Sequence, residues 1–211
     1  MLERNILIID DNLNVETVYI PIYNRKISNL KKNDPKWKDY SFNFKYCSSM
    51  KSALEYLSIP STYVDVLVVD YEFNGETTFA DGTAFVEYVR NHINRYCQII
   101  FYTMQGASSI AVNEWAKLVN SDVFRFIDKR TSDNELAHAI FEAATKRNPI
   151  VESLERFWIK YSAMLEAYSY TFDGESITFK EIINHIRMDD EIGRVFIEKL
   201  MHKSILTNIE L

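Results

Sequence analysis

The stretch VDVLVVD at residues 64–70 decides the fold, because five of its seven residues are Val or Leu and it ends in a carboxylate. Runs of similar character lie at residues 6–9, 99–102 and 123–127. Continuous apolar runs of this length are typical of strands in a parallel sheet that is covered on both faces. Residues 42–47 alternate aromatic and polar side chains, which predicts an edge strand.

Helical patterns lie between these predicted strands, at residues 50–57, 83–93, 110–119 and 136–144. Strands that alternate with helices imply right-handed crossovers and a parallel sheet. The sequence therefore predicts one doubly wound α/β domain over about the first 147 residues.

Polar residues stand where the predicted strands end: Asp10 and Asp11, Asp70, Thr103, and Lys129. In open α/β sheets, ligands bind outside the carboxyl ends of the strands, so we expect these five side chains to converge. Clustered carboxylates repel one another, and Mg²⁺ with its preference for oxygen ligands relieves that repulsion. A carboxylate can also act as a nucleophile toward phosphorus, with a lysine ammonium and a threonine hydroxyl stabilising the transferred group.

The segments that carry these residues resemble the response-regulator receiver family: residues 6–12, 66–73, 81–90, 99–106 and 124–129. The resemblance covers about two thirds of the chain. It implies a flavodoxin-like, five-stranded parallel sheet with strand order 2-1-3-4-5. It also implies that Asp70 accepts a phosphoryl group from a histidine kinase or another phosphohistidine protein.

The same resemblance implies a Mg²⁺ site made by Asp11 with Asp10 beside it, by Asp70, and by the backbone carbonyl of Glu72. No other cofactor is implied.

Three further roles follow from the resemblance. Thr103 is expected to be the switch hydroxyl, Lys129 the phosphate-binding ammonium, and Phe126 the switch aromatic.

The chain departs from the family pattern around the expected site. Residues 26–39 form a polar insertion that contains Trp37, and Asn74 stands where the family usually has proline. Met104 follows Thr103 where a small residue is usual, and Arg130 follows Lys129 where proline is usual. These changes leave every chemical group in place, but they bear on the rate of phosphoryl exchange and on partner choice.

Residues 148–211 predict a second, mainly helical domain after a break at Pro149. Apolar residues at alternating spacings of three and four form a narrow heptad pattern: Val151, Leu154, Trp158, Tyr161, Leu165 and Tyr168. Such a pattern indicates either a helix packed within its own small bundle or a dimerisation helix, and fewer than three heptads do not decide between them.

Beyond this helix, Asp173–Glu175 predicts a turn, and Thr178 with Glu181 predicts a capping box. The two helices that follow, with an expected wing strand at residues 205–206, loosely resemble a helix-turn-helix. Residues 150–211 hold seven Lys and Arg against eleven Asp and Glu, however, and DNA binding needs positive charge. A protein-interaction or dimerisation module is therefore favoured over a DNA-binding one.

Composition fits a cytoplasmic protein, and the resemblance implies a signalling phosphoacceptor rather than an enzyme, with self-phosphorylation and autodephosphorylation at most. The net charge is −6, which disfavours anionic membranes, and no apolar run approaches a membrane span or a signal peptide. Cys47 and Cys97 lie in apolar stretches and are expected to be buried free thiols. Two alternatives stay open: a DNA-binding transcriptional regulator with a degenerate winged-helix tail, and a receiver-like interaction module that works without phosphorylation.

Overall fold

The computed structural model separates into two compact units, residues 1–146 (the first unit) and residues 147–211 (the second unit). The structure describes residues 2–59, 62–73, 75, 77–104, 110–130, 133–146 and 149–209.

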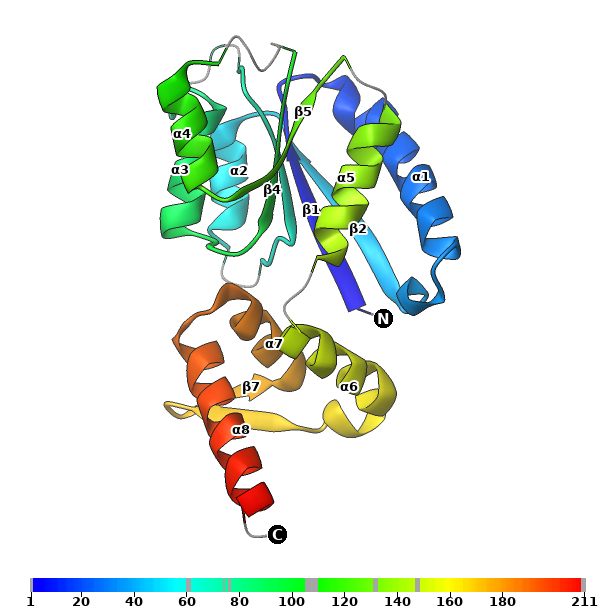
Figure 1. Ribbon diagram of the computed structural model, residues 1–211, viewed down its shortest axis with the longest axis vertical. Coiled ribbons are helices and arrows are strands. Elements are labelled where there is room, and N and C mark those ends of the chain that lie inside the picture. The colour runs from blue at the N-terminus through cyan, green and yellow to red at the C-terminus, as the bar shows by residue number, and fades with distance from the viewer. Residues whose placement is uncertain are drawn as a thin grey trace. The chain divides into compact units, whose positions relative to one another are not determined.

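The first unit is built on a five-stranded sheet in the order β2-β1-β3-β4-β5, and every neighbouring pair is parallel (Figure 1). This confirms the flavodoxin-like strand order 2-1-3-4-5. The strands are β1 Leu2–Ile9, β2 Tyr40–Cys47, β3 Val66–Asp70, β4 Gln98–Thr103 and β5 Val123–Asp128.

Helices cover both faces of this sheet (Figure 1). The side chains on one face pack against α1 (Ile20–Lys32) and α5 (Asp133–Thr145). Those on the other face pack against α2 (Met50–Leu57), α3 (Gly82–His92) and α4 (Val112–Asn120). Because both faces are covered, all five residues of the central strand β3 are buried, as its continuous apolar sequence indicates.

Helix α3 begins in contact with the end of β3, and Gly82 makes this contact possible. Asp81 caps the helix, its side chain accepting a hydrogen bond from the backbone N–H of Ala84 at 2.9 Å. A Cβ atom at Gly82 would lie only 2.1 Å from the backbone carbonyl oxygen of Asp70. The absence of a side chain at Gly82 therefore fixes how closely the helix approaches Asp70.

The polar insertion lengthens the region between β1 and β2. A π-helical turn, Val15–Tyr19, precedes α1, and a 3₁₀ turn, Pro35–Trp37, follows it. Trp37 is buried, with its ring 5.2 Å from that of Tyr40 and 6.0 Å from that of Phe141. It therefore packs within its own unit.

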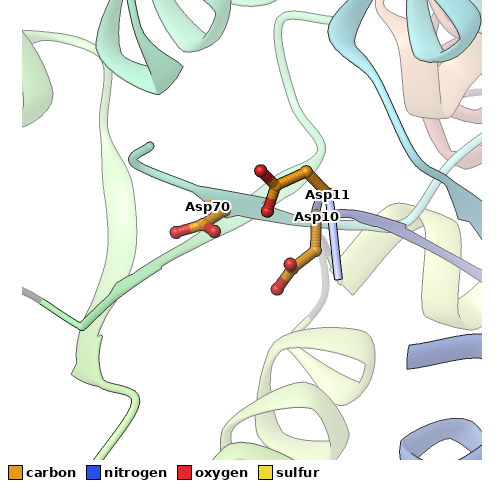
Figure 2. A group of neighbouring side chains, drawn as sticks. All are labelled: Asp10, Asp11 and Asp70. Atoms are coloured by element: carbon orange, nitrogen blue, oxygen red, sulfur yellow. The ribbon is translucent and has the colours of Figure 1, made fainter. Parts of the chain in front are cut away.

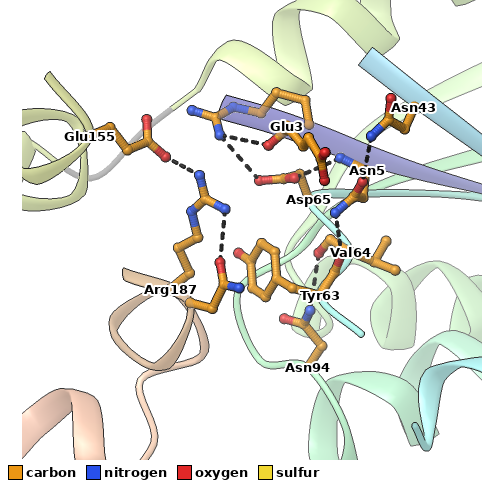
Figure 3. Close-up of polar contacts among 11 residues, drawn as sticks. Glu3, Asn5, Asn43, Tyr63, Val64, Asp65, Asn94, Glu155 and Arg187 are labelled. Atoms are coloured by element: carbon orange, nitrogen blue, oxygen red, sulfur yellow. Dashed lines mark hydrogen bonds and ion pairs between the residues drawn. The ribbon is translucent and has the colours of Figure 1, made fainter. Parts of the chain in front are cut away.

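At the amino ends of the strands, polar contacts join neighbouring chain segments of the first unit (Figure 3). The backbone N–H of Asn5 donates to Asp65 Oδ2 at 2.8 Å, and the side-chain amide of Asn94 donates to the carbonyl of Val64 at 3.1 Å. These contacts tie β1 and the end of the α3 region to the segment that leads into β3. The strand-end carboxylates lie at the opposite end of the sheet, where the strands have their carboxyl ends.

The second unit combines three helices with a short hairpin: α6 Pro149–Leu165, β6 Ser169–Phe172, β7 Glu175–Thr178, α7 Phe179–Met188 and α8 Glu191–Ile209. The predicted turn joins β6 to β7, which pair antiparallel, a hairpin that the sequence pattern did not predict. The capping box is confirmed, since Thr178 and Glu181 cap α7 reciprocally.

The heptad pattern of α6 packs mainly inside this unit. Val151, Leu154, Trp158 and Leu165 pack with Phe179 and Ile183 of α7. The rings of Trp158 and Phe179 are stacked with their centres 6.1 Å apart. Tyr161 has non-helical backbone angles, and Tyr168 lies beyond the end of the helix. The pattern therefore describes a helix of its own small bundle.

The expectation of a wing strand at residues 205–206 is wrong. Helix α8 continues through Ile205 and Leu206, because residues 191–209 contain no proline and only one early glycine to end it. The hairpin of this unit precedes α7 and does not follow the final helix. Within the described residues, every helix is too short or too polar to span a bilayer.

Candidate functional site

Strand register brings three polar side chains into one row at the carboxyl edge of the sheet. Ile9 pairs with Val69, so Asp10 lies one position beyond the end of β1, beside Asp70. Asp70 in turn pairs with Tyr102 across β3 and β4. The row is a direct result of parallel pairing, because the carboxyl ends of all the strands meet at this edge.

Asp10, Asp11 and Asp70 form an acidic cluster (Figure 2). Each offers a carboxylate oxygen, and these oxygens all lie within 4.8 Å of one another. Asp10 and Asp70 are buried, whereas Asp11 is half-buried. Buried carboxylates that lie this close repel each other, and hard oxygen ligands of this kind fit Mg²⁺.

Lys129 brings a positive charge into the cluster from the residue that follows β5. Its Nζ donates to Asp10 Oδ2 at 2.8 Å and to Asp70 Oδ2 at 2.5 Å. Its backbone N–H donates to the carbonyl oxygen of Thr103 at 2.8 Å, which fixes where the side chain starts. The ammonium therefore compensates two buried carboxylates at once.

Asp70 is held in an environment that disfavours its charged form. Burial raises the pKa of its carboxyl group from 3.8 to about 6, and the charge of Asp10 adds to this effect. Lys129 and the backbone N–H of Tyr71, which donates to Asp70 Oδ1 at 2.7 Å, partly oppose the rise. A cation bound at this edge favours the ionised carboxylate.

Tyr102 belongs to the site, and the sequence reasoning missed it. Its hydroxyl donates to Asp10 Oδ2, and Lys129 Nζ lies 4.4 Å from the centre of its ring. Burial and the charge of Asp10 raise the pKa of this hydroxyl. The missed signal was a tyrosine within the buried part of an apolar strand, one residue before its end, because a buried hydroxyl needs a hydrogen-bond partner.

The remaining predicted residues lie around this edge. Thr103 ends β4 and is fully buried, whereas Met104, which follows it, is 62% exposed. Glu72 lies in the exposed loop after β3, and its carbonyl as a Mg²⁺ ligand stays a prediction. Asn74 lies outside the described residues.

Phe126 of β5 belongs to a series of aromatic contacts that extends from the loop after Asp70 to α4. Its ring centre is 5.9 Å from that of Phe101 and 4.9 Å from that of Trp115. Tyr71 packs edge-on against Phe101 at 5.8 Å, and its hydroxyl donates to Glu114 in the first turn of α4 at 2.9 Å. The residue next to Asp70 is therefore linked to α4.

A pocket of about 230 Å³ opens beside the cluster, on the side of α1 and α5. Its lining includes Asp10, Tyr102 and Lys129, together with Tyr19 and Tyr23 from the region of α1. The cavity therefore borders Lys129 and one carboxylate of the cluster, that of Asp10.

Three comparisons with known proteins bear on this fold. No family model matches the chain, and no curated protein matches it. A response regulator receiver protein from Pseudomonas putida is similar in structure, with a TM-score of 0.50 and 15% identity, over 67% of this chain and 98% of that chain.

Two further solved structures have TM-scores of 0.49. The non-phosphorylated HemR receiver domain from Leptospira biflexa is 14% identical and aligns over 69% of this chain and 98% of that chain. A CheY-like receiver domain protein from Methanospirillum hungatei is 13% identical and aligns over 68% of this chain and 94% of that chain. At these identities the likeness concerns the fold: the first unit has the flavodoxin-like fold of response-regulator receiver domains.

Proposed function

We propose that this chain is a cytoplasmic response regulator that accepts a phosphoryl group on Asp70 from a histidine kinase or another phosphohistidine protein. One observation carries the proposal. A buried aspartate, two neighbouring carboxylates and a lysine ammonium meet at the carboxyl edge of a receiver-type sheet. In this proposal the chain is a signalling protein whose only chemistry is to gain and lose that phosphoryl group.

The reaction follows from the position of Asp70. One oxygen of its carboxylate attacks phosphorus, the new O–P bond forms as the P–N bond of the donor phosphohistidine breaks, and the imidazole leaves with the electron pair and takes up a proton. The ammonium of Lys129 already lies at Asp70 Oδ2, so it is placed to neutralise charge on the transferred group.

The acidic cluster is the proposed Mg²⁺ site. Asp11, Asp10 and Asp70 would hold the ion with carboxylate oxygens, and Glu72 with its backbone carbonyl. When bound, Mg²⁺ supplies positive charge that offsets the repulsion between the carboxylates and the incoming phosphoryl oxygens. Asp10 Oδ1 also accepts from the backbone N–H of Asn12 at 2.8 Å, which fixes the carboxylate plane beside the site.

Thr103 and Phe126 are the proposed switch. The added charge on Asp70 draws the Thr103 hydroxyl toward the phosphoryl group, and Phe126 repacks against the face made by α4, β5 and α5. The contacts of Phe126 with Phe101 and Trp115 support this route, because a change at β4 shifts the packing of α4.

The second unit is the proposed output module, which binds a protein partner or a second copy of the chain. Large apolar side chains are exposed on its surface, among them Phe157, Met164 and Met201. Acidic residues outnumber basic ones in this part of the chain, and the final helix lacks the wing that the DNA-binding alternative expects. Both features favour protein binding over DNA binding.

Intact-protein mass spectrometry tests the proposed function. We expect a phosphate adduct after incubation with a small phosphoryl donor and Mg²⁺, and none when Mg²⁺ is removed or in Asp70→Asn. If neither a small donor nor a cognate kinase gives an adduct, the proposal is wrong and the phosphorylation-independent interaction module takes its place.

A further inference from the structure

Tyr102 is unusual among the side chains of its sheet face. The inward residues of the same face are aliphatic at the neighbouring positions, including Val68, Ile100 and Ile127. Unlike these three residues, Tyr102 carries a hydroxyl, and that hydroxyl reaches Asp10 Oδ2, the oxygen that also accepts from Lys129. One buried carboxylate oxygen therefore has two donors, of which one is cationic and one is neutral.

We propose that Tyr102 is a positioning residue of the acceptor site, which keeps Asp10 hydrogen-bonded when Lys129 turns from the carboxylates to a phosphoryl group on Asp70. The inference rests on the proposed function. It goes further, because it assigns to the strand residue before Thr103 a role that none of the expected site residues fills.

Lys129 has two tasks in the proposed reaction, because it neutralises the carboxylates at rest and the phosphoryl group after transfer. In the structure its ammonium lies between Asp10 and Asp70. Once a phosphoryl group is bonded to Asp70, its oxygens compete for that ammonium, and the contact with Asp10 weakens. Asp10 is only 1% exposed, so water does not replace the lost donor easily.

Tyr102 is suited to cover this loss, because its position does not depend on Lys129. Its backbone belongs to β4, where it pairs with Asp70 on one side and Ile127 on the other. Its ring is buried against the α1 and α5 face, so the hydroxyl stays at Asp10 when the ammonium moves. A phenol is a neutral donor, which leaves Asp10 anionic and able to hold a divalent cation.

Tyr102→Phe tests the proposal, since it keeps the ring and removes the hydroxyl. Tyr40→Phe is the matched control, because Tyr40 is also a buried tyrosine of the first unit but lies at the start of β2, at the opposite end of the sheet from the acidic cluster. Isothermal titration calorimetry measures two affinities in each protein: that for Mg²⁺ alone, and that for beryllofluoride, a phosphoryl mimic, with Mg²⁺ saturating.

We expect Tyr102→Phe to change the Mg²⁺ affinity less than about threefold, because Lys129 still satisfies Asp10. Beryllofluoride affinity should fall roughly tenfold or more, the loss typical of one hydrogen bond to a charged group. The control should change neither affinity. If Tyr102→Phe weakens both affinities equally, or weakens neither, the proposal is overturned. A merely structural role of Tyr102 would not affect the beryllofluoride affinity more than the Mg²⁺ affinity.

A double-mutant cycle tests the same role without any phosphoryl mimic. In urea unfolding with EDTA, Tyr102→Phe should reduce the folding equilibrium constant at least tenfold more in a Lys129→Met background than in the original chain. Additive effects of the two changes overturn the proposal. If Lys129→Met does not fold, the separation between Mg²⁺ and beryllofluoride affinities decides alone.

The two experiments also separate this inference from the proposed function. If the original chain binds no beryllofluoride in the presence of Mg²⁺, the phosphoacceptor function is wrong, and so is the role of Tyr102 during phosphorylation. If the chain binds beryllofluoride and Tyr102→Phe binds it equally well, only the role of Tyr102 is wrong.

Discussion

At the scale of single residues, Asp70 has opposing effects on stability and on reactivity. Its carboxyl pKa of about 6 lies above the ordinary value of 3.8, so the folded state holds this proton more tightly than the unfolded state. The stability of the fold therefore falls as the pH rises from about 4 to about 6, and it stays lowered above that range. The nucleophile is ionised at neutral pH at the expense of stability.

Asp70→Asn should remove that penalty. In urea unfolding with EDTA at pH 7, we expect the variant to be more stable than the original chain, by up to about 3 kcal/mol. Below pH 4 the difference should vanish, and millimolar Mg²⁺ at pH 7 should reduce it by stabilising only the original chain. A difference that is the same at pH 4 and pH 7 would contradict the role of Asp70 burial.

Lys129→Met should have the opposite effect at neutral pH. Two buried carboxylates lose their ammonium, and breaking a buried charge pair from one side costs about 3–5 kcal/mol. Lys51→Met, on the exposed side of α2, is the control and should be close to neutral. Mg²⁺ should restore part of the lost stability. Equal stability of the two variants would show that Lys129 compensates neither carboxylate.

At the scale of elements, the contact between α3 and β3 sets the position of the nucleophile. Gly82→Ala places a Cβ against the Asp70 carbonyl, so the helix or the strand end must shift. We expect a loss of about 1–3 kcal/mol in urea unfolding, together with slower appearance of the phosphate adduct. Glu87→Ala, on the surface of the same helix, should leave both measurements unchanged. An adduct that forms at the original rate in Gly82→Ala would mean that the contact does not position Asp70.

Elements also show what the sequence could and could not predict. Asp10, Asp11, Asp70, Thr103 and Lys129 were predictable as neighbours, because parallel pairing brings residues at strand ends to one edge. The hydrogen-bond partners of these residues were not predictable. Strand periodicity identifies which face of the sheet a side chain lies on, but it does not identify which hydroxyl on that face donates to a carboxylate. The sequence pattern therefore predicts no role for Tyr102 beyond its place in the apolar run at residues 99–102.

The second unit was harder to predict for a different physical reason. Strands β6 and β7 have four residues each and are mostly exposed, so they lack a run of buried residues that would identify them. The expected wing strand at residues 205–206 rested on two apolar residues, Ile205 and Leu206, which fit a strand as well as a helix. Whether a helix continues through them depends on the whole segment of residues 191–209. The capping box at Thr178 was predictable, because its signal is entirely local.

At the scale of the whole molecule, the proposed division of labour requires that the two units have separate cores. Each unit has its own apolar clusters, and each has a buried ion pair within it. In the second unit, Arg187 donates to Glu155, which is fully buried, and its other terminal nitrogen donates to Asn184 at 3.2 Å (Figure 3). In the first unit, the corresponding ion pairs join Lys129 to Asp10 and Asp70.

These two ion pairs allow each core to be weakened alone. Arg187→Met leaves Glu155 buried without its guanidinium, so we expect the second unit to unfold earlier, by about 3–5 kcal/mol, while the phosphate adduct on Asp70 still forms. Trp158 reports on the second unit, and Trp37 and Trp115 report on the first, so Trp158→Phe and the double change Trp37→Phe with Trp115→Phe assign the steps of a fluorescence-detected urea titration. Lys129→Met should shift only the other transition. If the chain shows a single transition that both substitutions move by the same amount, it unfolds as one cooperative body. The output would then have to act through a shared core rather than through the docking of a separate module.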